Sequence, residues 1–217
     1  QLKNILQECG CDGKRLGVEY DSYGLTAKNG KMLDYALDGF CQLTDASNLV
    51  NRLRVVKSPA ELVYVQRAAE LADEALDEAH SMVKGGCDEA KLLAAMQGAI
   101  FKGGGDYPGN EFIIGSGENA LLCRYYSGRR KLSSKDQITL EWAGAYRHYH
   151  AAMMRTIPVG LVTEQHWKMH AVCLEAMEAC ESVLRPGKAI GEVFDAYSHS
   201  CDSAGMQGHR LNATGYS

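Results

Sequence analysis

Groups able to transfer protons gather in one short stretch of the sequence. Glu141, His148 and His150 stand within ten positions of one another, and carboxylates and imidazoles are common general bases and nucleophiles. Alternating apolar residues around Glu141 predict a strand that sets Thr139 and Glu141 on one face. Glu141 is therefore a candidate nucleophile or water-activating base. A structural ion pair with an arginine is the alternative, because an unpaired buried carboxylate is costly.

His148 and His150 follow Glu141 in the sequence. Along one regular strand, Tyr146, His148 and His150 would share a face and Tyr149 would lie on the other. His150 is predicted to shuttle a proton, since imidazole titrates near neutral pH. A purely structural role is the alternative for His150 and is the preferred interpretation for His148.

Hydrophobic periodicity predicts the elements that position these groups. We expect helices over 2–9, 26–37, 49–56, 59–83, 88–101, 163–184 and 190–203. We expect strands over 15–20, 40–44, 112–114, 120–126, 138–142 and 146–159. Ser58 with Glu61, Asp88 and Thr163 provide the helix starts.

The order of elements predicts two domains and an internal repeat. Residues 1–55 read as the C-terminal part of an N-terminal α/β domain, and 56–217 as a catalytic α+β domain. A shift of 101 residues aligns Gly86 with Gly187 and Gly104 with Gly205, which indicates two αα-then-β repeats. Because the second repeat has few residues after its helices, we expect further strands beyond Ser217.

The composition argues against several classes of partner. The chain has 217 residues, 46% hydrophobic, with a net charge of −4. It has no basic stripe, so we expect no nucleic-acid partner, and no apolar run of membrane-spanning length, so we expect no membrane partner. The eight cysteines form no CxxC pair, which predicts buried, reduced thiols in a cytoplasmic protein.

The stretch 141–156 resembles the metal-site hairpin of the creatinase/prolidase family, also called M24 or pita-bread. The family pattern is roughly Asp-x-Gly-x-x-Tyr-x-x-Tyr-x-x-Asp-x-x-Arg-Thr, and Tyr146, Tyr149, Arg155 and Thr156 match it. The stretch Arg-Val-Val-Lys-Ser-Pro-Ala-Glu-Leu at 54–62 also resembles the entry to the family's catalytic domain. The resemblance implies a pita-bread fold, a small-molecule substrate and a homodimer.

The family's metal ligands are altered at each position this chain contains. Family metallopeptidases hold two metal ions on two Asp, one His and two Glu. Those positions fall on Glu141, Ala152 and Tyr216 here, and the two Glu would lie beyond Ser217. A dinuclear site needs several carboxylates, so we expect no bound metal.

The family includes metal-independent members, ectoine hydrolase and creatinase, which cleave non-peptide C–N bonds. The motif here, with Gly104-Gly105-Asp106-Tyr107-Pro108 and Thr214-Gly215-Tyr216-Ser217, is similar to ectoine hydrolase. The resemblance implies metal-independent hydrolysis of a C–N bond in an ectoine- or creatine-like solute. Arg124 stands where ectoine hydrolase has His, so the substrate is expected to be a relative of ectoine.

The substrate would then be held by four side chains. Arg124 offers a guanidinium fork for a carboxylate, Tyr216 a hydroxyl at the former metal position, and Tyr107 a pocket-lining ring. Arg155 matches the family's Arg-Thr pair. Structural roles, including a carboxylate partner within the sheet for Arg155, are the alternatives.

Two other functions stay open. Glu141 with His148 or His150 and two further glutamates could bind one divalent ion, as in a metal-dependent Xaa-Pro peptidase. Because Ala152 removes a ligand without supplying a replacement, the chain could also be a non-catalytic protein that binds a small ligand.

Overall fold

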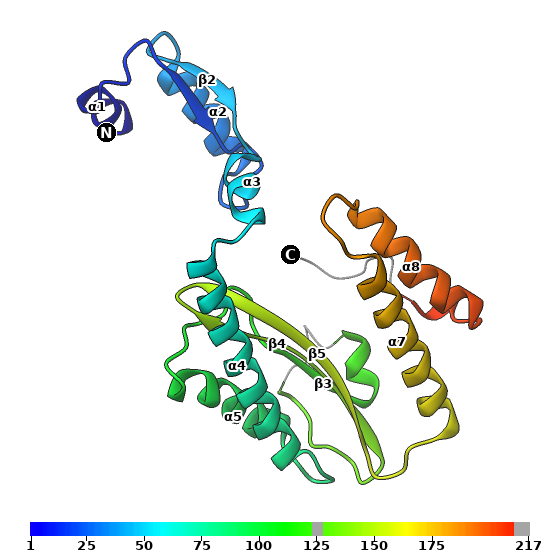
Figure 1. The fold of residues 1–217 in the computed structure, drawn as a ribbon. Coiled ribbons are helices and arrows are strands. Elements are labelled where there is room, and N and C mark those ends of the chain that lie inside the picture. Colours follow the sequence, from blue (N-terminus) through cyan, green and yellow to red (C-terminus); the bar gives the residue numbers. More distant parts are fainter. Residues whose placement is uncertain (123–127, 211–217) are drawn as a thin grey trace. The chain divides into compact units, whose positions relative to one another are not determined.

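The computed structural model describes residues 1–122 and 128–210. The chain divides into two compact units, Gln1–Gln66 and Arg67–Ser217. Figure 1 gives the order of the elements in each unit. The predicted roles of Arg124 and Tyr216 fall on residues outside the described ranges.

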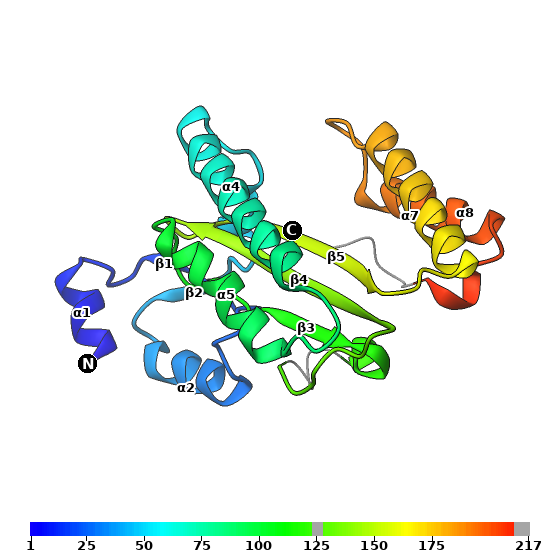
Figure 2. The ribbon, with the colours of Figure 1, turned by 90° about the horizontal axis from the view of Figure 1, so that it is seen from below.

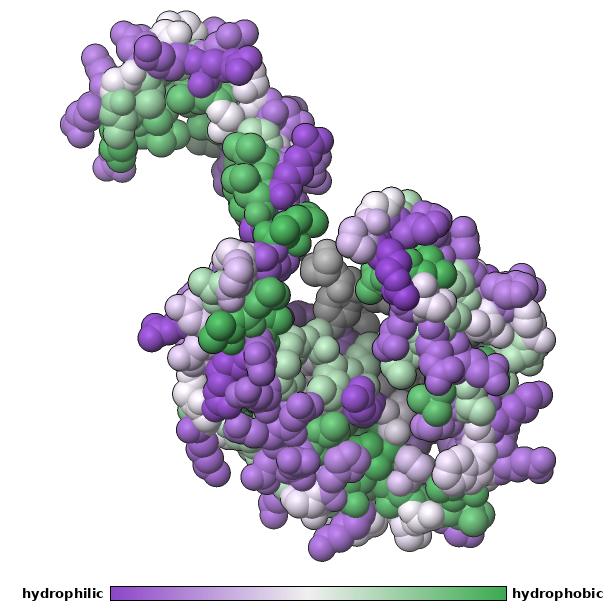
Figure 3. All heavy atoms as spheres, in the orientation of Figure 1, coloured by the Kyte–Doolittle hydropathy of each residue, from purple (hydrophilic) through white to green (hydrophobic). Residues whose placement is uncertain are grey.

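The first unit contains a βαβ arrangement. Strands β1 (Arg15–Val18) and β2 (Gln42–Asp45) pair in parallel, joined by α2 (Ala27–Leu37) and flanked by α1 (Leu2–Glu8) and α3 (Leu49–Val55). Parallel pairing requires such a crossover. Apolar side chains gather along α3 and stay exposed (Figure 3).

The helix starts predicted from sequence are confirmed. At α4 (Pro59–Met82), Ser58 N–H donates to Glu61 Oε2 at 2.6 Å, and Glu61 N–H donates to Ser58 Oγ at 3.4 Å. Asp88 Oδ1 accepts from the Ala90 N–H at the start of α5 (Glu89–Lys102). These carboxylates and hydroxyls satisfy backbone donors that the helix leaves unpaired.

An antiparallel sheet with order β3-β4-β5 lies at the centre of the second unit (Figure 2). Its strands are β3 (Ile113–Ser116), β4 (Asp136–Tyr146) and β5 (Tyr149–Val159). A 3-10 helix, η1 (Gly117–Leu122), follows β3. The strand predicted over 120–126 is therefore wrong for residues 120–122, and residues 123–126 lie outside the described ranges.

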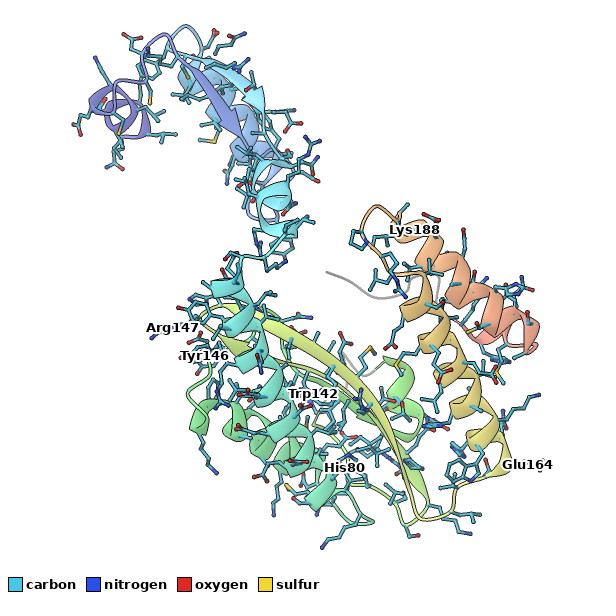
Figure 4. All side chains as sticks on the ribbon, viewed as in Figure 1. His80, Trp142, Tyr146, Arg147, Glu164 and Lys188 are labelled. Carbon is cyan, nitrogen blue, oxygen red and sulfur yellow. The ribbon has the colours of Figure 1, made fainter. Side chains whose placement is uncertain are left out.

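Helices α4 and α5 cover one face of this sheet (Figure 2), and the main hydrophobic core lies between these helices and the sheet. Ile138, Leu140 and Trp142 alternate along β4 as buried residues of that core. The Trp142 indole, labelled in Figure 4, donates to the Ala72 carbonyl of α4 at 3.0 Å. At Gly144, a Cβ atom would lie 1.9 Å from the Ala68 carbonyl oxygen. Only glycine allows β4 and α4 to approach this closely.

A second helix pair repeats the first. Helix α7 (Glu164–Val183) begins at the predicted cap Thr163, and α8 (Ile190–Ser203) is followed by the short 3-10 helix η2 (Gln207–His209). Helix α8 begins 101 residues after α5 begins and ends 101 residues after α5 ends. The repeat predicted from sequence is thus present in the helices, and the α+β class is confirmed.

The hairpin corrects the predicted distribution of side chains. Arg147 and His148 have φ of 51° and 64° and form a two-residue turn between Tyr146 and Tyr149, which pair directly. His148 is therefore not in a strand. Since paired residues share a face, Tyr146 and Tyr149 lie together and His150 lies opposite. The prediction treated 146–159 as one uninterrupted strand and missed this change of register.

The predicted burial of the cysteines holds for only some of them. Among the described residues the cysteines are free thiols, of which Cys201 is buried, while Cys9 and Cys173 are exposed. Burial raises the pKa of the Cys201 thiol. Within the described ranges, no helix has the length and apolar character needed to cross a membrane.

Candidate active site

Glu141 lies on the sheet face opposite to helices α4 and α5. Along β4, Leu140 and Trp142 are buried toward those helices, whereas Glu141 between them is half-buried. Its cross-strand partners are Ile113 on β3 and Met154 on β5, so the carboxylate stands between two apolar side chains. We call this side of the sheet the open face.

The two positions aligned with the family's aspartates lie close together. Ala152 on β5 pairs with Ala143, and Glu141 pairs with Met154 two residues further along β5. Glu141 and Ala152 are thus diagonal neighbours on the open face, a separation of about 7–8 Å. The register brings this carboxylate next to a methyl group.

Hydroxyl groups occupy the other side of Glu141. Thr139 pairs with Thr156, and their Oγ1 atoms lie 3.3 Å apart on the open face. Thr139 was predicted to share the face of Glu141, which is confirmed. The Thr–Thr pair was not foreseen, because finding it requires the β4–β5 register. It offers a hydrogen-bonding group to a substrate at Glu141.

Arg155 lies on the opposite face from Glu141. It pairs with Leu140, a buried residue of the helix-covered side, and donates from Nη1 to the Met154 carbonyl at 2.7 Å. A side chain on that side of the sheet cannot line a cavity on the open face. The structure therefore does not bring Arg155 to the substrate position expected for it.

His150 shares the open face with Glu141 but lies far along the strand. It pairs with Ala145, four residues from Glu141, or about 13 Å at 3.3 Å per residue. Its Nε2 accepts from the Gly109 N–H at 2.8 Å, and its Nδ1 bonds the His148 carbonyl at 2.9 Å. With both nitrogens bonded to backbone, His150 is placed to hold a loop, which differs from the proton-shuttle role predicted.

Tyr107 belongs to the loop that His150 holds. Asp106 N–H donates to the Ala145 carbonyl at 2.8 Å, and Asp106 Oδ2 accepts from the His148 N–H at 3.1 Å. The Tyr107 ring is 80% exposed and meets Phe101 edge-on at 4.8 Å. The loop is therefore bound to the tip of the β4–β5 hairpin, where Figure 4 shows Tyr146 and Arg147.

The donor set of the open face does not fit a dinuclear metal site. Among the described strand residues on this face, Glu141 is the sole carboxylate. Nowhere in residues 1–122 and 128–210 do three or more His, Cys, Asp or Glu side chains form a group that could hold a metal ion. Two dications on one carboxylate would be far from charge balance.

Comparison with known proteins identifies the family. The model of Metallopeptidase family M24 matches residues 64–217. The chain belongs to the M24 family. Its relatives include enzymes named for different substrates.

Two curated relatives illustrate that range. Ectoine hydrolase of Halomonas elongata is 26% identical over 94% of this chain and 53% of its own length. Xaa-Pro dipeptidase of Pyrococcus furiosus is 25% identical over 67% of this chain and 42% of its own length. The M24 chain thus spans about half the length of these relatives.

Solved structures confirm the pita-bread fold. The X-Pro aminopeptidase of Thermotoga maritima has a TM-score of 0.85 at 18% identity, covering 95% of this chain and 57% of the other. The prolidase of Pyrococcus furiosus has a TM-score of 0.83 at 21% identity, covering 96% and 60%. At these identities the likeness establishes the fold of this M24 protein.

Proposed function

We propose that this M24 protein hydrolyses a C–N bond in a small nitrogenous solute of ectoine-like or creatine-like chemistry, without a metal ion. The observation that carries the proposal is the position of Glu141 beside Ala152 on the open face. A single carboxylate among the described strand residues of the open face, with apolar and hydroxyl neighbours, suits proton abstraction better than the binding of two dications. The ectoine hydrolase relative supports the substrate class.

In this proposal, Glu141 acts directly in the cleavage of the C–N bond. As a base, Glu141 takes a proton from water while the hydroxide oxygen bonds to the substrate carbon. The C–N bond then breaks, and the leaving nitrogen takes the proton from Glu141. As a nucleophile, the carboxylate itself would bond to that carbon while the C–N bond breaks and the leaving nitrogen takes a proton from water. The hydroxide formed in this way would then cleave the acyl intermediate and restore the Glu141 carboxylate.

Substrate contacts in the proposal come from several segments. The Thr139–Thr156 hydroxyls lie beside Glu141 and accept or donate to the solute. Arg124 and Tyr216 stay proposed substrate ligands, and Tyr107 a pocket-lining residue. His150 and Arg155 act in this proposal by holding the loop and the sheet.

A metal-dependent Xaa-Pro peptidase is the second candidate. Xaa-Pro enzymes stand among the relatives at 25% and 28% identity, similar to the 26% of ectoine hydrolase. In that case Glu141 would be one ligand, and the others would lie outside the described residues.

Turnover by the purified protein separates the candidates. Ectoine and the dipeptide Ala-Pro are incubated with protein of known metal content, before and after chelation. The proposal predicts release of the ring-opened product of ectoine or a related cyclic amidine by metal-free protein. Cleavage of Ala-Pro that chelation abolishes establishes the peptidase. Binding of the solute without turnover establishes a non-catalytic ligand-binding protein.

A further inference from the structure

Met154 is a half-exposed methionine on the open face of the sheet, directly across from Glu141. The β4–β5 register pairs the two residues, which puts their Cβ atoms about 5 Å apart. The Met154 side chain is 52% exposed, although methionine is more often found inside proteins. An exposed apolar side chain beside a candidate catalytic carboxylate is in position to contact a substrate.

The other cross-strand neighbour of Glu141 is much less accessible. Ile113 pairs with Glu141 from β3 and is only 3% exposed. The three residues form one row across the sheet, because residues paired in register point to the same face. Met154 is thus the apolar member of this row that a solute at the carboxylate can reach.

Two kinds of side chain border this row along the strands. On one side, the Thr139 and Thr156 hydroxyl oxygens lie 3.3 Å apart. On the other side, Ala143 pairs with Ala152, which is exposed. The described residues of β4 and β5 therefore offer side-chain oxygens on one side of the carboxylate and methyl groups on the other.

This arrangement matches the polarity of an amidine that carries an alkyl group. The amidine carbon bears two nitrogens, whose N–H groups need acceptors, and a third substituent. When the nitrogens bond Glu141 and the threonine hydroxyls, the third substituent is directed to Met154 and Ala152. An alkyl group fits that surroundings, whereas an amino group would exchange its bonds to water for a weak sulfur acceptor at best.

We propose that Met154 is a specificity residue, which selects cyclic amidines with an alkyl group on the amidine carbon over cyclic guanidines of the same size. The inference rests on the proposed function, since it places the solute beside Glu141. One contact of this kind discriminates by about tenfold to a hundredfold. The flexible thioether adapts its shape to the alkyl group and takes no part in the making or breaking of bonds.

The test uses ectoine, whose amidine carbon carries a methyl group, and the analogue in which an amino group replaces that methyl. Calorimetry on metal-free protein gives the dissociation constant of each compound, and a separate assay measures whether either compound is cleaved. The parent chain is expected to bind ectoine about tenfold more tightly or better. Met154→Gln keeps the length of the side chain but adds an amide oxygen that accepts from the amino group, so the preference is expected to fall about fivefold or more.

Two control variants separate specificity from stability. Met154→Leu keeps an apolar side chain of similar volume and is expected to retain the preference for ectoine. Met153→Gln makes the same chemical change one residue earlier, where the side chain pairs with Trp142 and packs against the main core. It is expected to lower the free energy of unfolding and leave the ratio of the two dissociation constants unchanged.

Each outcome decides the inference separately from the proposed hydrolysis. A preference that Met154→Gln leaves unchanged, or that Met153→Gln lowers equally, overturns the inference. A parent chain that binds neither compound, or binds both equally, overturns it as well. The expected preference without cleavage of either compound supports the role of Met154 and overturns the proposed hydrolysis alone.

Discussion

Glu141 and Ala152 are diagonal neighbours across the β4–β5 pair, on the sheet face that α4 and α5 leave open. The antiparallel register sets Ala143 opposite Ala152 and Met154 opposite Glu141. A carboxylate and a methyl group thus occupy adjacent positions that, in a metal-binding relative, would both need oxygen donors.

This relationship predicts the effect of restoring a carboxylate. Ala152→Asp would set two negative side chains within reach of one cation, and we expect Mn²⁺ affinity to rise at least tenfold over the parent chain. Isothermal titration calorimetry measures the change. Ala152→Asn, which has nearly the same shape without the charge, is expected to behave like the parent. Equal Mn²⁺ affinity in the Asp and Asn variants would argue against the placement of these two residues.

The close approach at Gly144 predicts a large stability effect. Gly144→Ala introduces a methyl group 1.9 Å from the Ala68 carbonyl oxygen, so β4 must move away from α4, at a cost of about 3 kcal/mol or more. Urea denaturation followed by circular dichroism measures the free energy of unfolding. Gly98→Ala, in α5 with open space at its Cβ, is expected to stabilise by up to about 1 kcal/mol. A Gly144→Ala variant as stable as the parent would contradict the packing of β4 on α4.

The hairpin turn predicts a stabilising change. Arg147 and His148 both have positive φ, which costs about 1–2 kcal/mol for each residue with a Cβ. Replacing them together by Asn-Gly, the pair preferred in such turns, is expected to raise the free energy of unfolding by about 1–2 kcal/mol. The pair Ala-Ala keeps the unfavourable conformation and is expected to give no gain. A lower stability with Asn-Gly would mean that the Arg147 and His148 side chains stabilise the tip by other contacts.

The Arg130–Asp136 pair predicts a pH-dependent contribution. Burial alone would raise the pKa of Asp136, but the Ser133 amide, the Arg130 guanidinium and the Gln137 amide together hold this pKa below its usual value. Because the folded pKa is the lower one, the contribution is complete above the unfolded value of about 3.9 and is lost as the pH falls through the folded pKa. Asp136→Asn should therefore destabilise by about 1–3 kcal/mol at pH 7.

The same comparison at low pH completes that test. As the pH falls below about 4 and through the lowered folded pKa, the stabilities of the parent and Asp136→Asn should converge, since protonation removes the charge in the parent as well. Asp202→Asn, which breaks the pair of Arg210 with a carboxylate more exposed than that of Asp136, is expected to cost less at pH 7. A penalty for Asp136→Asn that is the same at pH 3 and pH 7 would contradict the role of the charge.

Local sequence signals predicted the elements well and the site only in part. The Ser58–Glu61 capping box and the alternation around Glu141 depend on neighbouring residues, so they could be recognised without a structure. The face of Arg155, the bonds of His150 and the Thr139–Thr156 pair depend on register, which the unforeseen turn at Arg147 and His148 determines. Met154 gave no signal, because its place across from Glu141 depends on the same register.

The central claim is that Glu141 performs the hydrolysis without a metal ion. The most direct measurement compares metal-free, chelator-treated parent protein with Glu141→Gln. The substrate is ectoine or the related cyclic amidine that the parent cleaves, and urea denaturation verifies the fold. We predict full activity in the chelated parent and a loss of at least a thousandfold in Glu141→Gln at unchanged stability. Activity that disappears on chelation and returns with Mn²⁺, or a Glu141→Gln variant that keeps its kcat, would contradict the claim.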